Sequence, residues 1–220
     1  MNALAFDTST AACAVALRRA DGELFEVRPP ASRLIERPAH TTELLPAILE
    51  LTGRAGISLG QVESLAVGIG PGAFTGLRIG VATARAIATA NQIDLVAVSS
   101  LAALGIGGQT PVIDARRSEL YFRTNGVDQL AGPEEAIDRI AVAESIAVGD
   151  GALKYRNELG AAGVAVAPPD DELHVVSAAA ILELSDALPA HRPDEVVPNY
   201  IRPPDAKVSS RESWLVGPAK

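Results

Sequence analysis

The amino-acid sequence predicts an α/β fold in which mixed β-sheets are flanked by helices. Strand-length apolar runs alternate with helix-length runs, and a glycine-rich turn joins one such strand to a long helix. A strand, aspartate, turn and strand pattern occurs at residues 4–17 (LAFDTSTAACAVAL) and again at 111–124 (PVIDARRSELYFRT). This repeat predicts two related lobes.

The first half of the chain predicts a mixed sheet with two long helices. Asp21-Gly22 is typical of a hairpin turn between two strands. Pro46 is expected to bend a helix or to mark its first turns. The expected strands are residues 2–7, 11–18, 23–28, 64–69 and 94–98, and the expected helices are residues 40–54, 74–91 and a short piece ending near 104.

The second half predicts a smaller lobe. Glycines at positions 105, 107 and 108 favour a lobe boundary there, which gives lobes at residues 1–104 and 105–220. The segment after Pro189 is rich in proline and charge, so we expect an extended surface tail. The expected strands are 111–114, 119–124 and 144–148, and the expected helices are 133–141, 150–159 and 177–188.

Composition excludes several classes of protein. The 220 residues are 48% apolar and 21% charged, which is typical of a globular chain. The net charge of −8 and an aromatic content of 4% argue against autonomous nucleic-acid binding. No basic leader and no apolar run of membrane-spanning length is visible. The single cysteine, Cys13, cannot form an internal disulfide, so we expect a reducing cytoplasm.

Asp7 lies in a polar turn at the end of the first predicted strand. Such a turn can direct hydroxyl groups and amides at a phosphate, which makes Asp7, Ser9, Thr10 and the nearby Gly72 candidate nucleotide contacts. An Asx-type turn that bonds its own backbone is the simpler interpretation. A phosphate-binding loop usually has glycine where Ser9 stands.

The glycine-rich segment 68–76 also has two interpretations. It can present a helix N-terminus to an anion, or it can bring the helix tightly onto the sheet. In the following helix, Gly76, Gly80, Ala84 and Ala88 recur every four residues and form one smooth ridge. Glycine inside a helix is unfavourable, so this ridge predicts close approach by another backbone, from this chain or, as we favour, from a partner.

Candidate catalytic groups are few. Asp7 and Asp114 could face each other across a cleft between the lobes, which leaves a small-molecule kinase or ATPase as an alternative function. His40, His174 and His191 have no companion at metal-ligand spacing. A peptidase is disfavoured because the sequence contains no pattern that pairs a nucleophile with a base.

Several motifs resemble the TsaB family, also called YeaZ. The first are the opening LAFDTST, the helix start HTTELLP at residue 40, and the block VGIGPGAFTGLRIGVAT from residue 67 to 83. SSLA at residue 99, IDAR at 113, GDGA at 149 and PNYIR at 198 follow in the family's order. The resemblance covers essentially the whole chain.

The resemblance implies an actin/Hsp70-like ATPase (ASKHA) fold of two ribonuclease-H-like lobes. It also implies a role in making N6-threonylcarbamoyladenosine (t6A) at position 37 of tRNAs that read ANN codons. The catalytic paralogue, TsaD, carries a metal-binding His-x-x-x-His motif, where this chain has Ser100 and Leu104. Because leucine cannot bind a metal, we expect a subunit that is not an enzyme and has no catalytic or metal-binding residues.

The family's docking surface for TsaD consists of the first two helices of the N-terminal lobe, which are residues 40–54 and 74–91 here. The same surface is expected to form a homodimer in isolation. The expected interface residues are His40, Leu44, Leu45, Ile48, Gly76, Leu77, Gly80, Ala84 and Ala88.

The resemblance further implies that TsaE, with ATP, acts on the TsaB–TsaD pair. The second-lobe turn Ala115-Arg116-Arg117 lacks glycine, so we expect no cofactor on the chain alone and ATP use only by the assembled complex. tRNA is expected to reach the chain only through the complex, and no membrane partner is expected.

Overall fold

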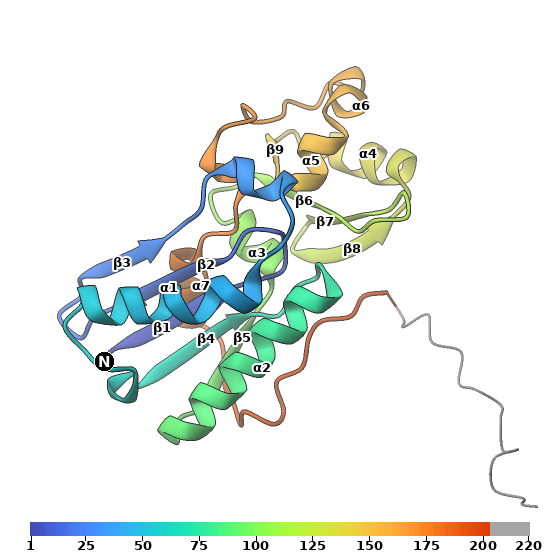
Figure 1. Ribbon diagram of the computed structural model, residues 1–220. Coiled ribbons are helices and arrows are strands. Elements are labelled where there is room, and N and C mark those ends of the chain that lie inside the picture. The colour runs from blue at the N-terminus through green and yellow to red at the C-terminus, as the bar shows by residue number, and fades with distance from the viewer. Residues whose placement is uncertain (203–220) are drawn as a thin grey trace, which may run out of the picture.

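The computed structural model describes residues 1–202, which form two β-sheets with helices packed on their faces (Figure 1). The first sheet has the strand order β10-β5-β4-β1-β2-β3, and the second has the order β8-β7-β6-β9. None of the helices in this part of the chain combines the length and hydropathy needed to cross a bilayer.

The two sheets repeat one topology. In the first, β1 lies antiparallel to β2 and parallel to β4, and β2 continues into antiparallel β3. In the second, β6 lies antiparallel to β7 and parallel to β9, and β7 continues into antiparallel β8. This shared order confirms the repeat. The strands of the first sheet are β1 (Ala3–Asp7), β2 (Ala14–Arg18), β3 (Leu24–Val27), β4 (Ser64–Gly68), β5 (Leu95–Val98) and β10 (Ala190–His191).

Large apolar side chains cover one face of the first sheet. Leu4 and Phe6 alternate along β1 with alanines, and they pack beneath α1 (His40–Arg54) and α2 (Phe74–Asn91). Pro46 lies in the second turn of α1, and the helix continues through it. Figure 1 shows these two helices side by side on the same side of the sheet.

Alanines line the opposite face of this sheet. Their small side chains let α7 (Ala178–Ser185) and α3 (Ser100–Leu104) pack against the strands. Residues after 177, which the sequence analysis assigns to the second lobe, therefore return to the first sheet, and β10 pairs with β5. The alanines are Ala3, Ala5, Ala14, Ala16 and Ala66.

The second lobe is smaller and has its own core. Its strands are β6 (Thr110–Asp114), β7 (Leu120–Thr124), β8 (Val127–Ala131) and β9 (Ala147–Val148). Its helices are α4 (Pro133–Ala141), α5 (Asp150–Lys154) and α6 (Arg156–Ala161), and 3-10 turns lie at η1 (Ala31–Ile35), η2 (Leu59–Gln61) and η3 (Glu172–His174).

Some expected elements differ from those observed. β8 was not predicted, and the single helix expected at 150–159 breaks at Tyr155 into α5 and α6. Cys13 lies just before β2 rather than within a strand, and burial raises the pKa of its thiol to about 12. The expected tail contributes β10 to the first sheet, and its residues 203–220 lie outside the described part of the chain.

Candidate functional site

Asp7 is the last residue of β1, and both oxygens of its buried carboxylate accept hydrogen bonds. Its Oδ1 accepts from the Ser9 backbone N–H at 2.8 Å and from the Ser9 hydroxyl at 2.6 Å. Its Oδ2 accepts from the Ser100 hydroxyl at 2.5 Å. Burial raises the pKa of the carboxyl, and the Ser100 and Ser9 donors oppose that rise. The bond from the Ser9 amide confirms the Asx-type turn.

Glycines of the following strand, turn and helix make room for this turn. A Cβ at Gly68 would overlap the Asp7 carboxylate, one at Gly72 would overlap the Ser9 carbonyl, and those at Gly76 and Gly80 would overlap Thr8. We call Gly68, Gly72, Gly76 and Gly80 the glycine socket. The glycine-rich segment therefore lets the β1–β2 turn pack closely against the β4–α2 turn and the first turns of α2.

Hydrogen bonds close the socket. The Ala73 amide donates to the Ser9 carbonyl at 2.7 Å, and the Thr8 hydroxyl donates to the Gly76 carbonyl at 2.8 Å. The Ser9 carbonyl thus takes a position at the N-terminal end of α2, where an anion would otherwise be attracted. Ser9 and Thr10 are buried as well, so the predicted nucleotide contacts belong to a packed turn.

The small-residue ridge on α2 faces inward, contrary to the sequence-based expectation. Gly76 and Gly80 contact Thr8, and Ala84 and Ala88 are buried in the core. Other expected interface residues are also covered by the chain itself, because they pack between the helices and the sheet. The buried members are His40, Leu44, Ile48, Gly76, Leu77, Gly80, Ala84 and Ala88, which leaves Leu45, with 50% of its surface exposed.

A second row on α2 faces outward. Its members again recur every four residues. The neighbouring helix α1 carries two exposed leucines, Leu45 and, with 59% of its surface exposed, Leu49. The sequence contains this second four-residue row as well, but the sequence analysis identified only the row of small residues that faces inward. We define the outward ridge as Phe74, Arg78, Ala82, Ala86 and Ala90.

His40 lies beneath the first turn of α2. Its Nε2 is 3.1 Å from the position that a Cβ on Gly76 would occupy. Neither ring nitrogen has a hydrogen-bond partner among the described residues, and burial lowers the pKa of the imidazole. The neutral ring therefore acts here as a packing element.

Asp114, the counterpart of Asp7 in the repeat, has charged partners. Lys154 Nζ lies 3.0 Å from its Oδ1, and Arg116 Nη1 lies 3.1 Å from its Oδ2. The turn that follows holds Arg116, Arg117 and Ser118 at φ values of 62°, 53° and 56°. Asp7 bonds the hydroxyl groups of Ser9 and Ser100 instead, so the two carboxylates have different partners.

Ser100 and Leu104 occupy the place that the resemblance compares with a metal-binding motif. The Ser100 hydroxyl accepts from the Gly70 amide at 3.0 Å and donates to Asp7, whereas Leu104 is buried in the core between the lobes. No cluster of three or more histidine, cysteine, aspartate or glutamate side chains in residues 1–202 could hold a metal.

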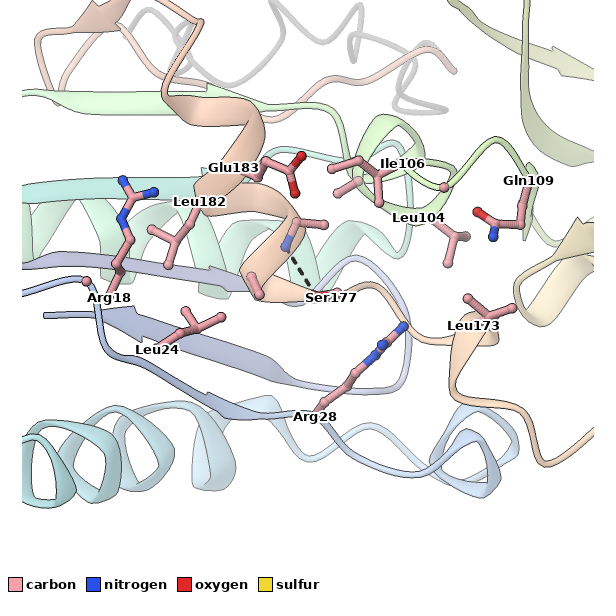
Figure 2. A pocket seen from close by; sticks show the side chains of 15 residues that line it. Arg18, Leu24, Arg28, Leu104, Ile106, Gln109, Leu173, Ser177, Leu182 and Glu183 are labelled. Carbon is pink, nitrogen blue, oxygen red and sulfur yellow. Dashed lines mark hydrogen bonds between the residues drawn. The ribbon is translucent and has the colours of Figure 1, made fainter.

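A separate pocket of about 480 Å³ lies over α7, beside β3 and the loop after α3 (Figure 2). Leu24, Leu104 and Leu182 give it an apolar lining, and Arg28 and Glu183 lie at its edge. The Arg28 guanidinium donates to the carbonyls of the η3 segment at 2.7 and 2.8 Å, so it fixes that segment. None of the predicted site residues lines this pocket.

Comparison with known proteins places these features in a family. The family model described as "TsaD: tRNA N6-adenosine threonylcarbamoyltransferase" matches residues 35–180. The Haemophilus influenzae "tRNA threonylcarbamoyladenosine biosynthesis protein TsaB" is 33% identical over 178 residues, which are 69% of this chain and 73% of that protein. The Escherichia coli protein of the same name is 38% identical over 133 residues, covering 56% of this chain and 54% of that protein.

A solved structure agrees in fold. The crystal structure of a Pseudomonas aeruginosa protein described by its similarity to peptidase YeaZ matches with a TM-score of 0.71 and 31% sequence identity. The match covers 91% of this chain and 99% of that one. The mixed sheets flanked by helices are consistent with the expected actin-like ASKHA fold. On these relationships, the chain belongs to the TsaB (YeaZ) family.

Proposed function

We propose that this chain is a non-catalytic subunit in the biosynthesis of threonylcarbamoyladenosine on tRNA. The names of its relatives support the biosynthetic role. The observation that carries the proposal is the closed glycine socket. Both oxygens of Asp7 accept hydrogen bonds from the chain itself, so the carboxylate is not open to a nucleotide-bound metal. Asp114 is likewise occupied by cations.

The outward ridge is the proposed docking surface for a TsaD subunit. Alanines at every fourth position let a partner helix approach closely, and the neighbouring helix α1 adds exposed apolar area at Leu45 and Leu49. In the proposed assembly, TsaE and ATP act on the resulting pair, and the product is t6A at position 37 of tRNAs that read ANN codons. Without the partner, two copies pair through the same ridge.

The decisive experiment measures t6A in tRNA digests by mass spectrometry. Reactions contain TsaD, TsaE, threonylcarbamoyl-adenylate synthase and ATP, with and without this chain. We expect t6A only when the chain is present, and no ATP hydrolysis or nucleotide binding by the chain alone. Equal t6A yield without the chain would reject the accessory role, and hydrolysis lost in Asp7→Asn would favour the kinase alternative.

A matched pair of variants tests the docking surface. Ala86→Glu places a carboxylate in the outward ridge, whereas Ala161→Glu places one on an exposed helix end in the second lobe. Burying an unpaired charge in an interface costs about 2–5 kcal/mol, so we expect at least about 30-fold weaker TsaD binding for Ala86→Glu. Unchanged binding by Ala86→Glu, measured by calorimetry, would contradict the assignment of this surface.

A further inference from the structure

The last described residues of the chain, 194–202, run along α2 and extend the surface around the outward ridge. The Arg85 guanidinium of α2 donates to the Asp194 carbonyl at 3.3 Å, and the Tyr200 ring contacts the Phe74 ring at the start of the helix. Figure 1 shows α2 with α1 on one side and this red segment on the other. We call residues 194–202 the flanking segment. It makes a part of the chain that is distant in sequence continuous with the outward ridge.

An aromatic cluster lies where the flanking segment meets the ridge. Phe74 is 52% exposed and Tyr200 is 41% exposed, and their ring centroids lie 5.3 Å apart with the planes tilted by 33°. The Arg78 guanidinium lies over the Phe74 ring, 4.5 Å from its centroid. We call Phe74, Arg78 and Tyr200 the aromatic cluster. Tyrosine and arginine are enriched among the few residues that supply most of the binding energy of protein interfaces, so the cluster has the composition of such a hot spot.

The helix α2 is basic within an acidic chain. It contains Arg78 and Arg85 and no carboxylate, although the net charge of the chain is −8. Arg78 forms no ion pair with a carboxylate of residues 1–202. Arg78 therefore suits a carboxylate of a partner. Carboxylates on α1 and on the flanking segment already bond within the chain, in the ion pairs Glu43–Arg33, Glu50–Arg54 and Asp194–Arg192 and in the bond from the Arg192 amide to Glu195.

Both lobes hold Tyr200 in place. On one side, the Asn199 amide donates to a carbonyl of the β4–α2 turn at 2.8 Å. On the other side, Arg202 donates to the Ala115 carbonyl of the second lobe at 3.0 Å and pairs with Glu119. The ring is therefore preorganised, which reduces the entropy lost when a partner binds.

We propose that the aromatic cluster is the hot spot of the docking surface, and that it binds an apolar side chain accompanied by a carboxylate on a helix of the partner. The proposal rests on the proposed function for the identity of that partner, a TsaD subunit. The apolar side chain packs on the two rings, and the carboxylate pairs with Arg78. Tyr200 thus adds a contact from outside the two docking helices, and Arg202 is a positioning residue that acts through Tyr200.

The first test measures TsaD binding by calorimetry with the full chain. We expect Tyr200→Ala to bind at least about 10-fold more weakly than the wild type, and Tyr200→Phe, which keeps the ring, to bind like the wild type. Leu188→Ala, at an exposed apolar position after α7, is the matched control. Urea titration checks that each variant folds. Equal binding by Tyr200→Ala and Leu188→Ala would overturn the proposal.

A second test concerns the charge of Arg78. Association rates with TsaD are recorded at about 0.1 M and about 1 M salt, because salt screens the attraction between an arginine and a carboxylate. We expect the rate to fall with salt for the wild type and to fall less for Arg78→Met. The control is Arg139→Met, which removes an exposed arginine from the second lobe. The same salt dependence in Arg78→Met and the wild type would overturn the assignment of a partner carboxylate.

A double-mutant cycle tests Arg202 as a positioning residue. Arg202→Met is expected to weaken TsaD binding by about 5-fold in the wild-type background and to have no further effect in the Tyr200→Ala background. A purely structural role in the second lobe would weaken binding equally in both backgrounds, and that result would overturn the positioning role.

The Ala86→Glu variant separates this inference from the proposed function. If Ala86→Glu loses TsaD binding and Tyr200→Ala does not, the docking surface stands and the hot spot is overturned. If neither substitution weakens binding, the docking surface and the hot spot are both overturned. If t6A forms without this chain while Tyr200→Ala still weakens TsaD binding, the accessory role fails and the hot spot stands.

Discussion

The β1–β2 turn and the β6–β7 turn begin from one sequence pattern, and their aspartates differ in the partners that surround them. Asp7 is buried among hydroxyl and amide donors inside the glycine socket. The Asp114 side chain is also covered, with 5% of its surface exposed, but it lies between the cations of Lys154 and Arg116. Each aspartate accepts a hydrogen bond from the backbone N–H two residues further on, at Ser9 and at Arg116. The difference teaches that the motif determines this local turn, while residues distant in sequence determine whether the carboxylate's other partners are hydroxyl groups or cations.

The largest expected effect comes from filling the socket. Gly76→Val places side-chain atoms on the Thr8 carbonyl and against His40, and backbone cannot move aside cheaply. We expect a loss of about 3 kcal/mol or more in the free energy of unfolding, measured by urea titration. The control is Gly132→Ala in the second lobe, where a Cβ meets nothing within 4 Å. An unchanged midpoint for Gly76→Val would show that the turn is not closely packed.

An intermediate effect is expected at Asp150, which faces Asp114 at the second turn. Burial, and to a lesser extent the Asp114 charge, raise its pKa to about 6, above the ordinary 3.8. The folded state therefore binds this proton more tightly, so the carboxyl reduces stability as the pH rises from about 4 to about 6.

Asp150→Asn removes the titrating carboxyl and with it this pH-dependent decrease in stability. Relative to the wild type, the variant is expected to gain up to about 3 kcal/mol in unfolding free energy between pH 4 and pH 7.5. Urea titrations at both pH values measure the difference, with Glu158→Gln as an exposed control. A variant whose stability changes with pH in parallel with the wild type would contradict the buried-carboxyl explanation.

The smallest effect is expected at Lys154. Lys154→Met removes one of the two cations on Asp114, and Arg116 remains. Partly exposed ion pairs contribute about 0.2–1 kcal/mol, so the predicted destabilisation falls in that range and shrinks at high salt. Thermal unfolding at low and high ionic strength checks it. A loss that is independent of salt would indicate packing by the lysine stem instead.

Local patterns predicted the long helices well. The expected ranges 40–54 and 74–91 coincide with α1 and α2, because apolar periodicity and the glycine-rich turn are local signals. Local patterns did not predict which of the two four-residue rows on α2 faces the core. Rows at 76, 80, 84, 88 and at 74, 78, 82, 86, 90 both satisfy the four-residue period, and only contact with Thr8 distinguishes them.

The candidate site depends on partners that are distant in sequence. Ser100 bonds Asp7 across 93 positions, and Tyr200 meets Phe74 from the far end of the described chain. Neither contact leaves a periodic signal, so the pattern-based analysis treated the Asp7 turn in isolation and overlooked Tyr200. The family resemblance supplied the fold but not these pairings.

The alanine face of the first sheet sets an order for folding during synthesis. Strands β1, β2 and β4 leave the ribosome early, yet α7, which covers their alanine face, ends only at Ser185. Until then one side of the growing sheet presents apolar surface without its cover. Truncation before α7 would therefore yield an aggregation-prone intermediate instead of a smaller functional lobe.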